Sequence, residues 1–308
     1  GSNIIKIRQL TGHGGILMRD YVLRATSGNG QVRAFVATTR NTVEEARRLH
    51  ETTKVATAAL GRTLTATSIM GLMMKNDSDK LTVIIKGGGP IGTIIATSDS
   101  KGMVKGYVGN PQVEVEDYPN GKLNVAAAVG TEGVVKVIKD LGLREPYNGT
   151  YPLVSGEIAE DFTYYFAVSE QTPSVVALGV LTKEDEVEFA GGFIVQLMPD
   201  AEEETIAKLE ENVAKLPSIT NMLKEGKSPE DILNIVLDGL EPKILDTCEV
   251  GFMCECSKER VKTALVAIGK KSLAQIIEED KKAEVGCQFC NKKYMYSEEE
   301  LLEILKEM

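Results

Sequence analysis

Apolar and β-branched residues alternate with polar ones along much of the first two thirds of the chain, a pattern typical of β-strands. Glycine or Asn-Gly sequences separate these runs, and a more continuous apolar run predicts one buried strand. We expect strands at residues 21–26, 32–38, 81–86, 92–98, 103–108 and 193–197. Helical spacing predicts helices at residues 42–74, capped by Asn41 or Thr42, and at 157–171. Residues 1–199 are therefore expected to form one large α+β core domain.

The pattern changes after residue 199, where apolar residues recur every three or four positions among many charged ones. Residues 201–216 predict an amphipathic helix ended by Pro217, and Ser228-Pro229 predicts the start of a second helix. The apolar stripes of the two helices consist of Ile206, Leu209, Val213 and Leu216, and of Ile232, Leu233, Val236, Leu237 and Leu240. Residues 200–247 are thus expected to form a helical linker whose apolar faces need a cover.

Residues 248–308 are expected to form a small third domain with three helices. Gly269 is expected to end the first helix, and the expected caps of the three helices are Ser257, Ser272 with Gln275, and Ser297 with Glu300. About sixty residues are too few to build a strong apolar core without a staple. This domain therefore needs another source of stability.

Four cysteines in two close pairs can supply that stability. The pairs are Cys254-Glu-Cys256 and Cys287-Gln-Phe-Cys290, separated by thirty residues. Four thiolates suit one tetrahedral Zn²⁺, and such spacing in a reducing compartment indicates a metal or redox site rather than structural disulfides. The basic residues beside the pairs favour the thiolate form, and they are Lys258, Arg260, Lys292 and Lys293. We expect all four cysteines to be zinc ligands.

The role of the zinc has two open interpretations. The ion is either only a structural staple, the commoner role of a four-cysteine site, or part of a redox switch. In the second case oxidation joins the cysteines as local disulfides, and loss of zinc removes about 10–16 kcal/mol of folding free energy. A domain of about sixty residues would then unfold and uncover whatever packs against it. Cys248 is either a spare thiol or an alternative oxidation partner of Cys254.

Composition excludes several classes of function. The 308 residues are 43% hydrophobic and 26% charged, which is ordinary for a globular protein. No apolar run is long enough to cross a membrane, and the N-terminal residues do not have the pattern of a signal peptide, so we expect a cytoplasmic protein. The net charge is −10, and residues 200–240 carry ten acidic and four basic residues. This charge argues against a zinc-ribbon-like protein that binds nucleic acid.

No convincing catalytic constellation is found, so we expect a protein that is not an enzyme. Residues 86–92 contain a G-x-G-x-x-G sequence, but β-branched residues follow it, which predicts a glycine turn between two strands rather than a nucleotide site. His13 is interpreted as a loop histidine. A thiol–disulfide oxidoreductase that uses Cys287 and Cys290 remains an alternative, although the motif lacks the βαβ setting of such enzymes.

Taken together, these motifs resemble the 33 kDa heat-shock chaperonin family, the oxidation-activated bacterial holdases. The resemblance covers essentially the whole chain, and the combination is highly specific. It rests on the four cysteines and on residues 59–63, 86–90, 108–111, 156–161, 169–174, 191–193 and 254–260.

This resemblance implies a mechanism and its partners. The reduced, zinc-bound protein is expected to be an inactive monomer. An oxidant is expected to form the disulfides Cys254–Cys256 and Cys287–Cys290 and to eject zinc, after which the zinc domain and the linker unfold. The protein then dimerises and holds unfolded client proteins without ATP, with no nucleic acid or membrane partner. The expected client contacts are Ile206, Leu209, Val213, Leu216, Ile232, Leu233, Val236 and Leu237.

Overall fold

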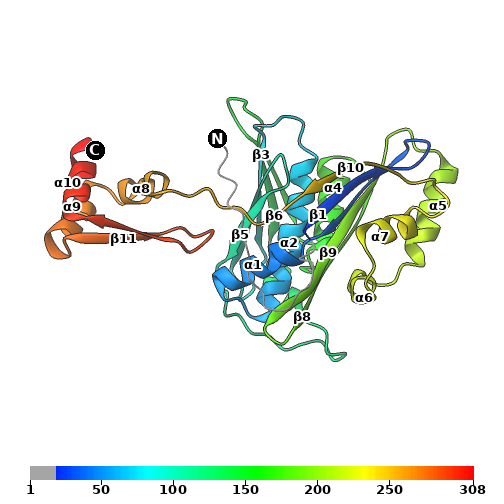
Figure 1. Ribbon diagram of the computed structural model, residues 1–308, viewed down its shortest axis with the longest axis horizontal. Helices are drawn as coiled ribbons and strands as arrows, with labels where there is room; N and C mark the ends of the chain where they lie inside the picture. Colours follow the sequence, from blue (N-terminus) through cyan, green and yellow to red (C-terminus); the bar gives the residue numbers. More distant parts are fainter. Residues whose placement is uncertain (1–18) are drawn as a thin grey trace.

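The computed structural model describes residues 19–308, so His13 lies outside the described residues. Two antiparallel five-stranded sheets form most of the core (Figure 1). The first sheet has the order β10-β1-β2-β9-β8, with β1 Tyr21–Thr26, β2 Val32–Thr38, β8 Ser174–Lys183, β9 Glu186–Leu197 and β10 Lys243–Glu249. The second has the order β5-β4-β3-β6-β7, with β3 Lys80–Lys86, β4 Thr93–Asp99, β5 Val104–Val108, β6 Val134–Asp140 and β7 Tyr147–Pro152. The expected α+β class is confirmed.

Helix α2, Lys54–Leu72, packs against strands of both sheets and is buried along nearly its whole length. Small residues at many of its positions, such as Gly61 and Gly71, let neighbouring elements approach closely. Its apolar residues join those of both sheets in one large core cluster, which α3, Val125–Val129, and α4, Ala159–Ser169, complete. The glycine run at residues 87–92 connects β3 to β4, as the sequence predicts.

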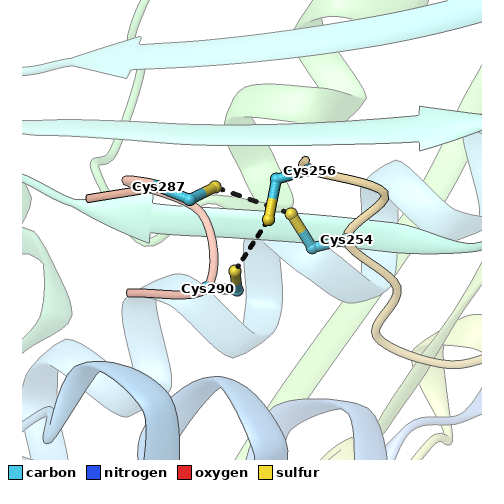
Figure 2. Close-up of side chains that lie close together, drawn as sticks. All are labelled: Cys254, Cys256, Cys287 and Cys290. Atoms are coloured by element: carbon cyan, nitrogen blue, oxygen red, sulfur yellow. Dashed lines mark hydrogen bonds between the residues drawn. The ribbon is translucent and has the colours of Figure 1, made fainter. Parts of the chain in front are cut away.

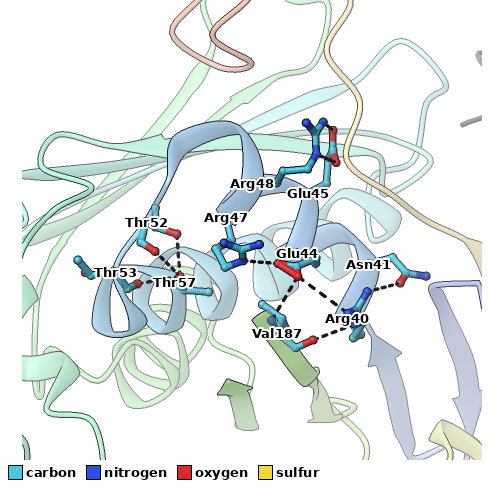
Figure 3. A network of polar contacts seen from close by, with 10 residues as sticks. All are labelled: Arg40, Asn41, Glu44, Glu45, Arg47, Arg48, Thr52, Thr53, Thr57 and Val187. Carbon is cyan, nitrogen blue, oxygen red and sulfur yellow. Dashed lines mark hydrogen bonds and ion pairs between the residues drawn. The ribbon is translucent and has the colours of Figure 1, made fainter. Parts of the chain in front are cut away.

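The prediction of a single helix at residues 42–74 is wrong, because the structure has two helices there. Helix α1 spans Arg40–His50 and follows Thr39 rather than Asn41 or Thr42. Glu51 then adopts a left-handed conformation with φ of 50°, which ends the helix, and the Thr53 hydroxyl caps α2 by accepting from the Ala56 N–H. Figure 3 shows this break, together with the buried Glu44, which accepts a hydrogen bond from the Val187 N–H of β9.

Three short helices cover the outer face of the first sheet. They are α5 Glu203–Ala214, α6 Ile219–Lys224 and α7 Pro229–Val236, and we call them the linker helices. Ser228 caps α7 as predicted, in a reciprocal pair of hydrogen bonds with Asp231 of 2.9 and 3.2 Å. Apolar residues of these helices share a second core cluster with residues of β1, β2 and β9. The core sheet is thus the cover that the apolar stripes require.

Strand β10 follows the linker helices and pairs antiparallel with β1. This strand was not predicted from the sequence, and the expected boundary between residues 247 and 248 falls inside it. Nearly all of its residues are exposed, so the strand has no buried face that an alternating sequence pattern could have indicated. The pairing with β1 is what makes this segment a strand.

Residues 254–308 follow a short connection at residues 250–253 and form what we call the C-terminal module, which projects to one side of the core in Figure 1. It consists of α8 Lys258–Ala267, α9 Lys270–Glu279, β11 Lys282–Gly286, β12 Lys293–Ser297 and α10 Glu298–Glu307. The caps predicted at Ser257 and at Ser297 with Glu300 are confirmed. The cap predicted at Ser272 is wrong, because α9 already begins at Lys270, directly after Gly269 at φ of 87°.

Candidate metal centre

Two segments far apart in the sequence bring the four cysteines together (Figure 2). Cys254 and Cys256 lie on the segment that leaves the core before α8. Cys287 and Cys290 lie on residues 287–292, which connect β11 to β12 and which we call the cysteine turn. The Asn291 N–H donates to the Cys287 carbonyl oxygen at 2.7 Å, which closes the turn.

The four sulfur atoms lie within 4.8 Å of one another. The Sγ atoms of Cys254 and Cys287 are 3.6 Å apart, and those of Cys256 and Cys290 are 3.5 Å apart. A tetrahedral zinc ion with bonds of about 2.3 Å places its sulfur ligands roughly 3.8 Å apart. The donor atoms therefore fit a four-thiolate metal site, and the structure brings together the residues that the sequence selected.

Burial raises the pKa of the Cys254 and Cys290 thiols, and the neighbouring sulfur atoms raise it further. Four thiolates in so small a volume repel one another unless a cation neutralises them. Metal binding displaces the protons and supplies the missing positive charge. The cluster is thus suited to hold an ion rather than four free thiols.

Three of the four basic residues that were expected to stabilise the thiolates pair with carboxylates, and the fourth, Lys292, has its Nζ atom 5.4 Å from the centroid of the Tyr294 ring. The Nζ atom of Lys258 lies 2.5 Å from Glu300, and that of Lys293 lies 3.2 Å from Glu284. Arg260 contacts Glu255, with its Nη1 atom 3.9 Å from the carboxylate. A bound metal ion could therefore supply positive charge that these three side chains share with carboxylates.

The cysteine turn docks on the core through Phe289. Its ring meets Tyr107 of β5 edge-on at 5.2 Å between centroids, and the Lys105 Nζ atom lies 4.4 Å from the Phe289 centroid. The Tyr107 hydroxyl also donates to Gln288 at 3.0 Å. Sequence reasoning missed this contact, and the only available signal was an aromatic residue between two candidate ligands.

Two further hydrogen bonds join the cysteine turn to the end of α1. His50, which is buried, donates from Nε2 to the Phe289 carbonyl oxygen at 2.8 Å. The Asn291 side chain donates to the Leu49 carbonyl oxygen at 2.7 Å and lies 3.3 Å from His50 Nδ1. Burial lowers the pKa of His50, so the imidazole is neutral at pH 7. A neutral ring with its proton on Nε2 satisfies both contacts.

Cys248 is not part of the four-sulfur cluster found among the described residues. It lies on β10 opposite Val22 of β1, where it is half-buried. Burial raises the pKa of its thiol above the usual range, which makes the thiolate form scarce at neutral pH. Its role in oxidation stays a prediction.

The expected client-contact residues lie away from the cysteines, on the linker helices. Most are covered by the first sheet: Leu209, Ile232, Leu233, Val236 and Leu237 are buried, Val213 and Leu216 pack partly buried against the same cluster, and Ile206 is partly exposed. Most of these side chains therefore serve in the packing of the linker helices against the first sheet. No helix of residues 19–308 is long and apolar enough to cross a membrane.

The comparisons with known proteins agree with this architecture. A family model described as "Hsp33 protein" matches residues 20–297. The 33 kDa chaperonins of Alkaliphilus metalliredigens and Bacillus cereus are 53% and 49% identical over 292 residues, which is 94% of this chain and 100% of each relative. The crystal structure of the 33 kDa chaperonin from Thermotoga maritima superposes with a TM-score of 0.88 at 40% identity, covering 94% of this chain and 99% of that one. The chain therefore belongs to the Hsp33 family of 33 kDa chaperonins.

Proposed function

We propose that this chaperone is switched on by oxidation of Cys254, Cys256, Cys287 and Cys290. In the reduced state the four thiolates hold one Zn²⁺, and the protein is inactive. In the oxidised state it binds unfolding client proteins without ATP and keeps them from aggregating. The single observation that carries the proposal is the cluster itself, because its four sulfur atoms join two segments of one small module.

The stability of the C-terminal module depends on the link that the four cysteines make between its two segments. Its apolar core contains six buried residues, which are Leu265, Leu273, Ile277, Tyr296, Leu301 and Ile304. A core of this size supplies little stability, whereas zinc in a small site contributes about 10–16 kcal/mol to folding. Bound zinc supplies four bonds that hold the segment of Cys254 and Cys256 to the cysteine turn. Loss of those bonds would let the module unfold.

Oxidation removes the thiolates on which the bonds depend. Two thiolates give up two electrons and form one disulfide, while one molecule of hydrogen peroxide takes up the electrons and two protons and becomes two molecules of water. Two disulfides therefore consume two molecules of peroxide. A disulfide is a poor zinc ligand, because the thiolate is the form that binds the metal.

We propose the pairing Cys254–Cys256 and Cys287–Cys290, which the family resemblance implied. Each of these disulfides closes within one segment, so the two segments separate after oxidation. The alternative pairing of Cys254 with Cys287 and Cys256 with Cys290 would tie the segments together and keep the module closed. The sulfur atoms are close enough for both outcomes, since all four lie within 4.8 Å of one another.

Unfolding of the module would also destabilise the linker, residues 200–247, which precedes the module along the chain. The linker helices would then leave the core sheet and expose their apolar residues to clients. The many acidic residues of the linker would keep this open state in solution. We therefore propose three functional units, residues 1–199, 200–247 and 248–308, which act in the cytoplasm and form a homodimer after oxidation. None of these steps requires catalysis.

Light scattering of a heat-unfolding client protein tests the proposal. The zinc-bound reduced protein and the peroxide-oxidised protein are compared at equal concentration, without ATP. We expect suppression of aggregation only by the oxidised protein. Equal suppression by both forms, or by neither, would leave the zinc as a structural staple and would reject the switch.

A further inference from the structure

Strand β10 contributes almost no apolar burial to the core although it belongs to the core sheet. Six of its seven residues are exposed, and only Cys248 is partly buried. Ile244 and Leu245 expose about half of their surface, at 46% and 52%. The neighbouring strand β1 is different, because Val22, Leu23 and Ala25 are buried. The attachment of β10 therefore has to come from other interactions.

Backbone pairing is the main interaction that holds β10. Six residue pairs connect it to β1, from Tyr21 opposite Glu249 to Thr26 opposite Lys243, with an irregularity after Arg24. Arg24 also pairs with Asp246, but both side chains are about half exposed, so the ion pair contributes little. Each backbone hydrogen bond adds only modestly to stability, and ordering the strand costs conformational entropy. Without apolar burial, the strand is only weakly attached.

The two ends of β10 are anchored more firmly than its middle. Before the strand, the Gly28 N–H donates to the Leu240 carbonyl oxygen at 2.9 Å. After it, the buried Val250 joins the main core cluster, and its N–H donates to the Asp20 carbonyl oxygen at 3.1 Å. One anchor continues from α7 and the other continues into the segment of Cys254. The proposed oxidation would release the linker helices before the first anchor, whereas after the second anchor residues 251–253 still pair with Val104 of β5 and the released module begins beyond them.

We propose that β10 separates from β1 after oxidation and that the vacated edge of β1 binds an extended apolar segment of an unfolded client as an added strand. This inference rests on the proposed function, since it assumes that oxidation loosens the linker helices before β10 and the module beyond residue 253. Local unfolding of this kind is expected first where few apolar contacts resist it.

The chemistry of the vacated edge fits unfolded polypeptides. Loss of β10 would leave a row of unpaired backbone N–H and C=O groups on β1, and such an edge is a template for another strand. Backbone hydrogen bonds do not depend on the client sequence, whereas alternating side chains supply some preference. Val22 and Leu23 belong to the two different core clusters on the two sides of the sheet. Apolar residues on either face of a client segment would therefore lie beside an existing core cluster, at the edge where Ile244 and Leu245 now stay about half exposed.

Hydrogen exchange measured by mass spectrometry tests the occupancy of this edge. The readout is the protection of the amides of Tyr21–Thr26 in three samples: reduced protein, oxidised protein, and oxidised protein with a bound, heat-unfolded client. We expect protection in the first, partial loss in the second and recovery in the third. Unchanged protection after oxidation would show that β10 stays in place. Protection that is lost but not recovered would show that clients bind elsewhere.

A covalent staple provides the functional test. Arg24→Cys with Asp246→Cys joins two opposite residues whose side chains already meet, in a Cys248→Ser background that removes the nearby thiol. The matched control carries Arg24→Ser and Asp246→Ser in the same background. Peptide mapping confirms the staple, and both variants are then oxidised with peroxide.

We expect the stapled protein to release zinc as the control does but to lose most of its capacity to suppress aggregation, by roughly tenfold. Equal capacity in the two variants would overturn the added-strand inference while leaving the switch intact. Absence of oxidative activation in the unstapled control would instead reject the proposed function itself. A second copy of the chain at the vacated edge would give protection without client, which also contradicts the inference.

Discussion

The core and the C-terminal module are stabilised by different physical means. Helix α2 is buried along its length between two sheets, and its apolar contacts are insensitive to oxidants. The module has six buried residues and depends on four sulfur atoms that an oxidant can remove as ligands. Stability in one part is distributed over many side chains, whereas in the other it is concentrated at one site. This difference lets one part unfold while the other stays folded.

Loss of one cysteine ligand should destabilise the C-terminal module much more than the core. We expect Cys287→Ser to abolish tight zinc binding and to unfold residues 254–308, since about 10–16 kcal/mol of metal-dependent folding free energy is at stake. The core should keep its structure. Hydrogen exchange resolved along the sequence checks both statements, with Cys248→Ser as the control that keeps zinc. A module that stays protected without zinc would contradict this account.

A cavity in the core should destabilise the core and leave zinc binding by the module unchanged. Leu64 of α2 is fully buried, so Leu64→Ala is expected to lower the free energy of unfolding of the core by about 2–5 kcal/mol. Zinc content should not change. Chemical denaturation and a zinc assay measure the two quantities, with Leu302→Ala, at a half-exposed site, as the control expected to change stability by under about 0.5 kcal/mol. Zinc loss in the Leu64 variant would show that the two parts are not independent.

Loss of the contact between the cysteine turn and helix α1 should change the rate of zinc release, with a smaller effect than the two changes above. His50→Ala removes the hydrogen bond to the Phe289 carbonyl oxygen, which is worth about 1 kcal/mol. We expect peroxide to release zinc roughly fivefold faster, because the cysteine turn opens more often, while zinc content before oxidation stays the same. A chromogenic chelator follows the release. Arg48→Ala on the exposed side of the same helix is the control, and equal rates in the two variants would reject a role for docking.

Acid should weaken the same contact slightly. Burial holds the pKa of His50 below 6.5 in the docked state, whereas in the undocked state it returns to about 6.5. As the pH falls below about 6.5, His50 takes up a proton in the undocked state but not yet in the docked state. Docking therefore becomes less stable with falling pH until the pH is also below the pKa of the docked state. We expect the difference in zinc-release rate between His50→Ala and the unchanged protein to shrink between pH 8 and pH 5.5. A constant difference would show that His50 does not titrate on undocking.

The sequence predicted the cysteine cluster and most helix caps because these depend on short-range patterns. Each cysteine pair is recognised by a spacing of two or three residues, and Ser228, Ser257 and Ser297 each cap a helix that begins at the next residue. The break between α1 and α2 was missed because the helical pattern continues across it, while Glu51 in a left-handed conformation and the cap at Thr53 end and restart the backbone. Apolar spacing alone does not distinguish one long helix from two helices in sequence.

Strand β10 and the docking of Phe289 were missed for another reason. Both depend on partners more than 150 residues away, since β10 pairs with β1 and Phe289 meets Tyr107. Neither segment has a local pattern that requires its structure: β10 buries almost nothing, and one aromatic residue does not identify its neighbour. Long-range pairing of exposed segments is visible only in three dimensions.

The four cysteines of the C-terminal module are proposed to control the holding of client proteins. The most direct test follows zinc release and suppression of client aggregation in the same samples during a peroxide time course, with a final return to a thiol reductant and zinc. We expect client holding to rise as zinc is released and to fall again when zinc rebinds. Full zinc release without any gain in holding, or holding that precedes zinc release, would contradict it.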